Sequence, residues 1–342
     1  MRKTLTYIIL MLLTTAVVQA QLLPKLGSQR AGISALTFLK IDPSPRSAAM
    51  ASAHVSMAGD AYAAYWNPAA LADVETFSLA AANTFWVAGI NHAYFSAIKP
   101  TKIGKFALSI TSLSTGAMER RTEFQPNGTG EKFYASNTAV GLSYSKRLTD
   151  FFSYGITLKY INETLAEFTA HTGVVDMGFL YRTDFKDLSF AVVLQSFGTN
   201  SKLSGEYTPD SPNPSQIQLE SYPAPTLFKL GVSMIPWKTE TMSLTTMLQL
   251  NHPNDNAENI RIGLEYEYRD LLFIRAGYKI NVSDQVYPTA GLGLRTRIGK
   301  HRLVFDYGVD PTPYLGWIHR IGLSFSINKT EREPANDAPA TE

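Results

Sequence analysis

The sequence predicts an all-β protein, a 14-stranded antiparallel transmembrane β-barrel with an N-terminal plug in its lumen. Three observations lead to this prediction. An export signal opens the chain, and no apolar helix follows it. Apolar and polar residues then alternate with a period of two over most of the remaining length. Finally, the connections between the predicted strands are alternately short and long, which is typical of barrels in bacterial outer membranes.

Residues 1–20 have the pattern of a secretory signal peptide. Arg2 and Lys3 precede an apolar core over 7–13, and the small residues that end at Ala20 suit a signal peptidase. No later segment has the roughly 18 consecutive apolar residues that a membrane-spanning helix needs. The mature chain is therefore expected either to be soluble outside the inner membrane or to be a β-barrel.

Charge and cysteine content exclude several classes of protein. The chain of 342 residues has no cysteine, so it must be held by its core and its strand pairing without disulfides. Its 31 basic residues include Arg2 and Lys3, and removing these two with the signal leaves 29 basic against 29 acidic residues. A neutral chain gives no reason to expect a nucleic-acid partner.

Enzymatic chemistry is not expected. The 6 histidines are scattered without metal-ligand spacing, and the sequence has no nucleophile elbow. Glu265 and Glu267 are interpreted as salt-bridge partners rather than as an acid/base pair. We therefore predict no cofactor and no metal.

A period of two runs through residues 75–327, which form the predicted barrel domain. Apolar residues at every second position from Phe152 to Tyr160, for example, alternate with Ser153, Gly155, Thr157 and Lys159. We place the fourteen strands at 75–88, 90–99, 103–115, 133–147, 150–167, 172–183, 186–198, 224–236, 239–251, 258–270, 271–282, 286–298, 300–308 and 316–327. Most are about as long as a tilted strand that crosses a bilayer.

The connections between these strands sort by parity. Those after even-numbered strands are tight, at 101–102, 149, 184–185, 237–238, 270–271 and 299. Two of those after odd-numbered strands are long, at 116–132 and 199–223. Outer-membrane barrels have short periplasmic turns and long extracellular loops, whereas a soluble β-sandwich has no reason to keep this parity. Trp86, Trp317 and Trp237 fall at the heights of two aromatic girdles, with Trp237 in a periplasmic turn.

Charged residues alternate with apolar ones on neighbouring strands, and in a closed barrel they face inward. These predicted lumen charges are Arg261, Glu265, Glu267, Arg275, Lys279, Arg295, Arg297 and Arg320. A barrel of fourteen strands is wide enough to leak unless its lumen is occupied. Residues 21–74 fit the role of a plug because they are rich in Ala, Ser and Gly and contain several prolines. The polar residues 328–342 are interpreted as a disordered periplasmic tail.

Residues 31–72, AGISALTFLKIDPSPRSAAMASAHVSMAGDAYAAYWNPAALA, carry a family resemblance. They resemble the N-terminal region of the PorV/PorQ family of Bacteroidota outer-membrane proteins, which is itself similar to the FadL long-chain fatty-acid transporters. The shared elements are Phe38-Leu39, Arg46 followed by Ala-Ala-Met50, Asp60 and the block Trp66-Asn67-Pro68-Ala69. Where that family usually has Met-Gly, this chain has Met50-Ala51, so the close backbone approach that a glycine permits is not expected here.

The resemblance implies a FadL-like barrel in the Gram-negative outer membrane, in contact with its lipid, and a non-enzymatic role in type IX protein secretion. The implied partner is the C-terminal domain of a secreted cargo protein, or a protein of the translocon or of the surface attachment complex. Aromatic, arginine and proline residues suit docking surfaces. The candidate partner-binding residues of the two long loops are Glu119, Arg120, Arg121, Phe124, Tyr207 and Pro212. Solvated loops without a partner are the alternative.

Two other functions stay open: a FadL-like transporter of a hydrophobic small molecule, with a pocket between plug and wall, and a soluble exported β-protein. The predicted plug motif comprises Arg46, Met50, Asp60, Trp66, Asn67 and Pro68. Asn67-Pro68 is expected to turn the chain toward the first strand, and the Trp66 indole N–H to bond a lumen acceptor. Arg46 and Asp60 are expected to be paired with each other or with the lumen charges, since an unpaired buried charge is costly.

Overall fold

The computed structural model describes residues 32–57, 59–205, 219–282, 287–314 and 316–327. The predicted signal peptide and the predicted tail at 328–342 lie outside the described residues. Within the described part of the chain, no helix combines the length and the apolar character needed to cross a membrane.

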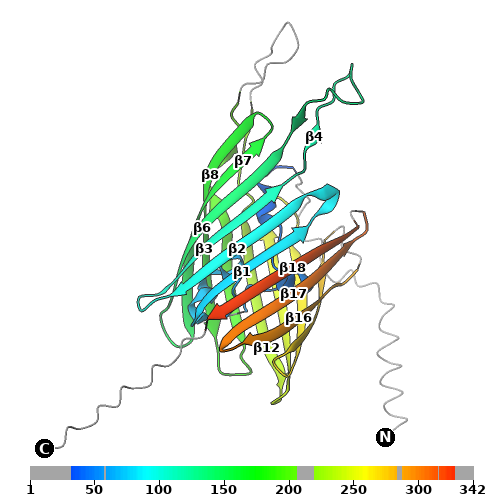
Figure 1. Ribbon diagram of the computed structural model, residues 1–342. Coiled ribbons are helices and arrows are strands. Elements are labelled where there is room, and N and C mark those ends of the chain that lie inside the picture. Colours follow the sequence, from blue (N-terminus) through cyan, green and yellow to red (C-terminus); the bar gives the residue numbers. More distant parts are fainter. Residues whose placement is uncertain (1–31, 58, 206–218, 283–286, 315, 328–342) are drawn as a thin grey trace, which may run out of the picture.

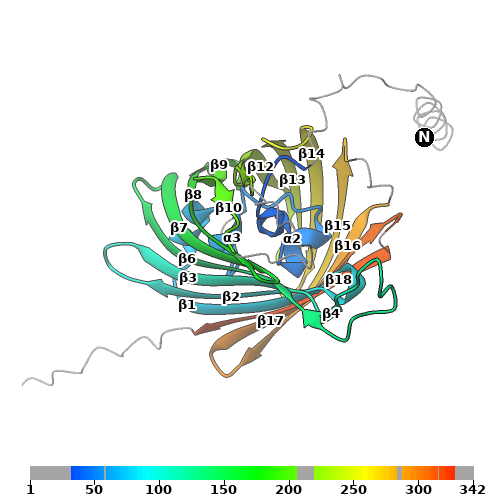
Figure 2. The same cartoon turned by 90° about the horizontal axis from the view of Figure 1, so that it is seen from above.

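Fourteen antiparallel strands close into a barrel, which confirms the predicted fold class (Figures 1 and 2). Each strand pairs with its neighbours along the ring, and the first strand pairs with the last over nine residues, from Phe77 opposite Ile327 to Phe85 opposite His319. The barrel strands are β1 (Phe77–Phe85), β2 (Asn91–Pro100), β3 (Lys105–Ser114), β6 (Ala135–Arg147), β7 (Phe152–Leu165), β8 (Phe168–Arg182), β9 (Ser189–Gly198), β12 (Leu227–Lys238), β13 (Met242–Pro253), β14 (Asn259–Tyr268), β15 (Leu272–Ile280), β16 (Thr289–Ile298), β17 (His301–Thr312) and β18 (Gly316–Ile327).

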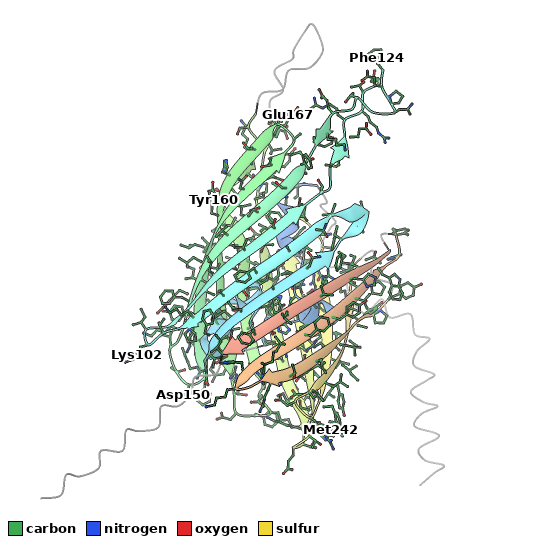
Figure 3. The ribbon with its side chains drawn as sticks, in the orientation of Figure 1. Lys102, Phe124, Asp150, Tyr160, Glu167 and Met242 are labelled. Carbon is green, nitrogen blue, oxygen red and sulfur yellow. The ribbon has the colours of Figure 1, made fainter. Side chains whose placement is uncertain are left out.

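Alternation of side chains divides every wall strand into an inner and an outer face. On β7, Ser153, Thr157 and Lys159 are buried, whereas Leu158 and Tyr160 are exposed. A strand places successive side chains on opposite faces, so the polar residues of the sequence pattern line the lumen and the apolar ones form an outer belt. Figure 3 shows Tyr160 on the outside of the wall.

The two ends of the barrel differ in their connections. Lys102, Asp150 and Met242 lie at the end with tight connections, the short-turn end, whereas Glu167 and Phe124 lie at the opposite, long-loop end (Figure 3). Two small hairpins belong to the long loops: β4 (Met118–Glu119) pairs with β5 (Lys132–Phe133), and β10 (Ser201–Lys202) pairs with β11 (Ser221–Tyr222).

One tryptophan position differs from the expectation. Trp237 was expected in a turn, but it belongs to β12 and is exposed on the wall. The reason is an irregular register between β12 and β13, which shifts between Met234 and Trp237 and lets β12 continue to Lys238.

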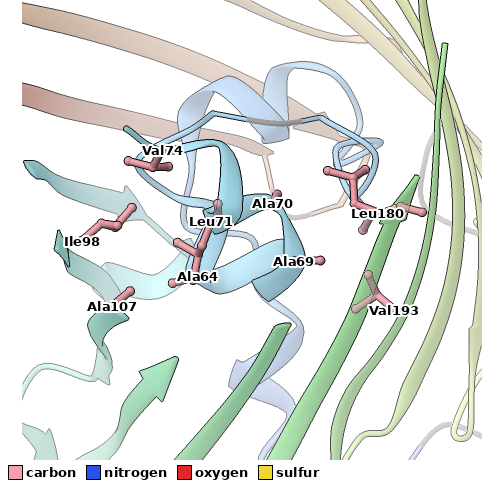
Figure 4. Packing of buried hydrophobic residues seen from close by; sticks show 12 residues of the cluster. Ala64, Ala69, Ala70, Leu71, Val74, Ile98, Ala107, Leu180 and Val193 are labelled. Carbon is pink, nitrogen blue, oxygen red and sulfur yellow. The ribbon is translucent and has the colours of Figure 1, made fainter. Parts of the chain in front are cut away.

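The N-terminal segment, residues 32–76, lies within the ring of strands, where Figure 2 shows its helices. It contains four short helices: η2 (Thr37–Lys40), α2 (Pro45–Ala49), α3 (Ala63–Trp66) and η3 (Pro68–Asp73). Their many small residues let the backbone approach the wall closely. In Figure 4, Ala64 and Leu71 lie between Ile98 and Ala107 on one side and Leu180 on the other, all in one buried apolar cluster.

The expectation that Met50-Ala51 lacks a close backbone approach was wrong. Ala51 adopts the left-handed conformation, with φ of 55°, that a glycine would take more easily. The necessary space comes from the wall, because a Cβ atom on Gly277 of β15 would overlap the backbone of Met50 and Ala51. Other inward-facing glycines also lie against the N-terminal segment, at 155, 178, 231, 263, 291, 308 and 322.

Adding a methyl group at Gly277 should therefore separate the segment from the wall. We expect Gly277→Ala to lower the free energy of unfolding by about 1–3 kcal/mol, the usual cost of overpacking a close-packed core. Urea unfolding of the folded barrel measures this difference. Gly173→Ala is the control, because a Cβ there meets only the Lys159 carbonyl oxygen, at 3.9 Å. Equal effects of the two substitutions would contradict the close approach.

Candidate functional site

The N-terminal segment is shaped by capping bonds to its own side chains. Ser44 caps α2 and accepts a hydrogen bond from the Ser47 N–H, with Pro45 at the first helical position. The buried Asp42 carboxylate accepts from the Ser44 N–H at 3.0 Å, the Ser47 hydroxyl at 2.6 Å and the Trp66 indole N–H at 3.3 Å. Asp42 thus joins α2 to the end of α3.

Asn67 and Pro68 turn the chain from α3 into η3. The Asn67 side chain accepts from the Ala69 N–H at 2.9 Å and donates to the Val55 carbonyl at 2.8 Å. Pro68 begins η3, where its fixed φ suits a helix start. Met50 is fully buried and packs with Ala53 and Met247.

A chain of ion pairs links the N-terminal segment to the wall. Arg46 donates two hydrogen bonds to Glu265 of β14, at 2.8 and 2.6 Å, and a third to Asp60 at 2.8 Å. Glu265 also accepts from Arg275 of β15 at 2.6 Å, and Arg275 reaches Asp306 of β17 at 2.6 Å. Two-pronged bonds between guanidinium and carboxylate fix geometry as well as charge, so the network holds α2 against three wall strands.

The burial of these groups shifts their proton affinities. Burial alone would lower the pKa of Arg46, but Glu265 and Asp60 outweigh it and hold that pKa well above its ordinary value. Burial alone would raise the pKa of Asp60, yet its neighbours His54 and Arg46 hold it well below its usual range. Burial dominates at His54 and lowers its pKa. His54 is therefore neutral. It lies 3.5 Å from Asp60, and its ring is tilted against the Trp66 ring with 4.0 Å between the ring centres.

A second group of charged side chains faces the lumen elsewhere on the wall. Lys159 of β7 pairs with Asp176 of β8 at 2.5 Å, and Lys279 of β15 pairs with Asp310 of β17 at 2.6 Å. Lys229 of β12 donates to the Gln195 amide oxygen at 2.6 Å. The remaining two cations are bonded to neutral groups, Arg261 to Asn259 and the Ala51 carbonyl and Arg320 to the Asp42 carbonyl.

Charges also tie both ends of the N-terminal segment. At the short-turn end, Asp73 contacts Arg147 of β6 and Arg182 of β8. Near the long loops, Lys40 pairs with Asp255 at 2.7 Å. These contacts attach the segment to β6 and β8 at one end and to the connection after β13 at the other.

Three of the predicted lumen charges lie at the short-turn rim rather than in the lumen centre. Arg295 contacts Asp270 and lies 3.6 Å from Glu267, and Arg297 is 3.2 Å from Asp270. Arg297 is 71% exposed. Arg261, Glu265, Arg275 and Arg320 lie deeper, in contact with the N-terminal segment or with its partners.

Toward the long-loop end the lumen becomes apolar. Leu36, Phe38 and Leu39 of the segment pack on inward-facing side chains of β3, β6, β7 and β8. These wall residues are Leu113, Ala139, Ile161 and Val174. We call this group the apolar chamber. A cavity of about 460 Å³ lies next to it, lined by Ala35, Glu163, Ser201, Leu203, Leu219, Glu220 and Tyr222.

The predicted loop residues are only partly brought together. Glu119, Arg120, Arg121 and Phe124 belong to the β4–β5 hairpin, Glu119 to its first strand and the other three to its loop. Arg120 lies 3.1 Å from Glu167, and Phe124 is 93% exposed. Tyr207 and Pro212 lie outside the described residues, so the structure does not place them.

Several buried lumen residues were not singled out from the sequence: Asp42, Lys159, Asp176, Lys229, Asp306 and Asp310. Five of them are inward-facing strand residues, and the same period of two that marked the other lumen charges could have identified them. Asp42 had no such signal, because its role depends on the fold of the segment. Among the described residues, no group of His, Cys, Asp or Glu is arranged to hold a metal ion.

Comparisons with known proteins identify the fold but no family. No protein-family model and no curated protein matches the sequence. The toluene transporter TodX of Pseudomonas putida is similar in structure, with 12% identity, a TM-score of 0.54, and 84% of this chain and 98% of that chain covered. The toluene transporter TbuX of Ralstonia pickettii gives 12% identity, a TM-score of 0.51 and coverages of 82% and 96%. A FadL homologue of Pseudomonas aeruginosa aligns with 11% identity, a TM-score of 0.48 and coverages of 84% and 97%.

Neutral His54 should make stability depend on pH below neutrality. The unfolded chain binds a proton at His54 below pH 6.5, its ordinary pKa, whereas the folded chain does so only at lower pH. Stability is therefore lost as the pH falls below 6.5, by about 1.4 kcal/mol per pH unit for one proton.

We expect His54→Gln to remove this part of the slope. The measurement is the free energy of unfolding in urea at a series of pH values. The matched control variant is His252→Gln, which makes the same substitution at an exposed histidine. Parallel profiles for all three proteins would show that His54 is not held neutral.

Proposed function

We propose that this chain is a non-enzymatic outer-membrane conduit for small hydrophobic molecules, with its N-terminal segment acting as a plug. The observation that carries the proposal is the apolar chamber beside the 460 Å³ cavity. An apolar outer belt and a closed ring of strands suit insertion in the lipid of a Gram-negative outer membrane.

The chamber and the cavity lie next to each other along the wall. On β7, Ile161 of the chamber is followed on the same face by Glu163 of the cavity. Ala35 of the cavity and Leu36 of the chamber are likewise adjacent in the segment. In the long loop, Tyr222 of the cavity is two residues before Ala224, which packs with the chamber residues. Ligand sites are commonly concave and mostly apolar with a few polar groups at the edge, which describes this arrangement.

The plug itself fills the chamber. Leu36, Phe38 and Leu39 are each 3% exposed, so they cover the apolar wall that a hydrophobic molecule would contact. A molecule could reach that wall only by displacing these side chains. Similarity in fold to two toluene transporters agrees with this class of substrate.

Photolabelling tests directly whether a hydrophobic molecule reaches the cavity and the apolar chamber. An alkylbenzene that carries a diazirine is applied to outer membranes containing the protein, and labelled peptides are mapped by mass spectrometry. We expect labelling around Ile161, Leu36 and Tyr222, reduced by excess toluene. Ile161→Asn should abolish the competed label, because it places an amide in the apolar wall.

The matched control is Ile98→Asn. Ile98 is also fully buried and faces inward, but it belongs to the cluster shown in Figure 4 and not to the chamber. Its substitution should leave labelling of the chamber peptides intact. If the label is confined to the outer belt, or if toluene does not compete, the conduit is refuted.

A second candidate function is docking of a secreted protein, as implied by the resemblance to the PorV/PorQ family of type IX secretion. The supporting observation is the hairpin β4–β5, which extends past the rest of the wall with Phe124 near its tip (Figures 1 and 3). Aromatic and arginine side chains are among those that contribute most of the binding energy at protein interfaces.

Phe124→Ala tests this function without disturbing the fold, since the side chain is 93% exposed. We expect the variant to insert normally but to lose most of its co-purification with the C-terminal domain of a type IX cargo protein. Tyr314→Ala is the control, because Tyr314 is 84% exposed on a different loop. Equal cargo recovery with wild type and both variants would exclude the hairpin as the docking surface.

A further inference from the structure

Three polar residues lie side by side on the inner face of the wall where the first and last strands meet. Thr84 of β1 is opposite Arg320 of β18 on one side and opposite His92 of β2 on the other. Directly opposed residues in antiparallel strands have Cβ atoms about 4.5–5.5 Å apart. All three are buried, with exposed fractions of 0% for Thr84, 0% for His92 and 3% for Arg320.

Four of their polar atoms have no hydrogen-bond partner among the described residues. This holds for the Thr84 hydroxyl, for both ring nitrogens of His92 and for Nη1 of Arg320. Arg320 is held by a different atom, Nε, which donates to the Asp42 carbonyl at 3.0 Å. An unsatisfied buried polar group is costly, and here such atoms come from adjacent positions on three neighbouring strands.

The charge around this row is positive. Lys159 and Lys279 are each paired with an aspartate, but Arg261 and Arg320 donate only to neutral groups in the hydrogen bonds described above. The Asp42 carboxylate is the third acid of the group, and it is occupied by Ser44, Ser47 and Trp66. Arginine keeps its charge in proteins, so the guanidinium groups of Arg261 and Arg320 and the ammonium group of Lys279 together face two carboxylates, those of Asp42 and Asp310. This leaves an excess of positive charge, to which Lys229 adds when it is protonated.

We propose that Thr84, His92 and Arg320 form a buried binding site for a compact monovalent anion, a halide or a small carboxylate. Such an anion accepts hydrogen bonds from Arg320 Nη1, from the Thr84 hydroxyl and from the N–H of a neutral His92. It also offsets the local positive charge. A water molecule could meet some of these groups but would leave the excess charge in place.

The site would connect the N-terminal segment to the closing strands. Arg320 is bonded to the backbone of Asp42, and Asp42 in turn organises α2 and α3. An anion bound to Arg320 would therefore link β1, β2 and β18 to the N-terminal segment, because Arg320 also holds Asp42. This inference does not depend on the proposed conduit, since the apolar chamber is built from β3, β6, β7 and β8.

Bromide is the probe, because it substitutes for chloride and scatters X-rays anomalously. Crystals of the full chain grown with sodium bromide should show an anomalous peak within hydrogen-bond distance of Arg320 Nη1. In detergent, the thermal unfolding midpoint should rise with bromide, chloride or acetate concentration when sodium gluconate keeps the ionic strength constant. A response to acetate but not to bromide would assign the site to carboxylates.

Variants separate the site from general salt effects. Arg320→Gln should lose the anion response, and Thr84→Val, which keeps the side-chain shape, should weaken it several-fold. Arg302→Gln is the control, since Arg302 is 43% exposed and lies near Asp270. If Arg320→Gln does not fold, Thr84→Val and the wild-type crystals still decide. Absence of the bromide peak together with no response to acetate, or an equal response of Thr84→Val and Arg302→Gln, overturns the proposal.

Discussion

The structure depends on one constraint: a closed ring of fourteen strands encloses more space than its own inward side chains can fill. The chain meets this constraint by combining a small-residue segment with a wall that carries glycines opposite it. At Gly155 and Gly277 the wall has no side chain, and the backbones at Pro68 and at Met50-Ala51 take that space. Segment and wall are therefore complementary in shape, and neither surface would be well packed without the other.

Charge complementarity follows from the same arrangement. A polar inner face places Glu265, Arg275 and Asp306 where little water reaches, and Arg46 from the segment completes their pairing. Burying ions is tolerable only when partners and geometry are good. The ion-pair network thus contributes more to the position of the segment than to its stability. Any displacement of α2 would leave acidic groups of the wall unpaired.

The barrel could be predicted from the sequence because its signals are local. The alternation from Phe152 to Tyr160 indicates which face each side chain takes, and the parity of the connections indicates the order of the strands. Both agree with the structure. The segment was harder to predict. Its short helices lack a repeating pattern, so the sequence could suggest its location but could not reveal that Asp42 bonds Trp66 or that Gly277 accommodates Ala51.

The lumen charges show where this kind of prediction stops. Arg297 and Arg261 occupy equivalent positions in their alternating patterns, yet one lies at the exposed rim and the other touches the segment. Alternation indicates which face a side chain takes but not its depth along the barrel. Depth depends on register and strand tilt, which are set by contacts between residues far apart in the chain.

The pairing of β1 with β18 has a consequence for the order of assembly. The pairing of β1 with β18 can form only after β18 has been made, whereas residues 32–76 precede every strand of the barrel in the chain. A segment that lies against the sheet before closure can form the contacts of Asp73 with Arg147 and Arg182 and those of Arg46 with β14 while the ring is still open. The sheet can then close around this segment. The pairing of β1 with β18, which joins residues far apart in the sequence, would be the last to form.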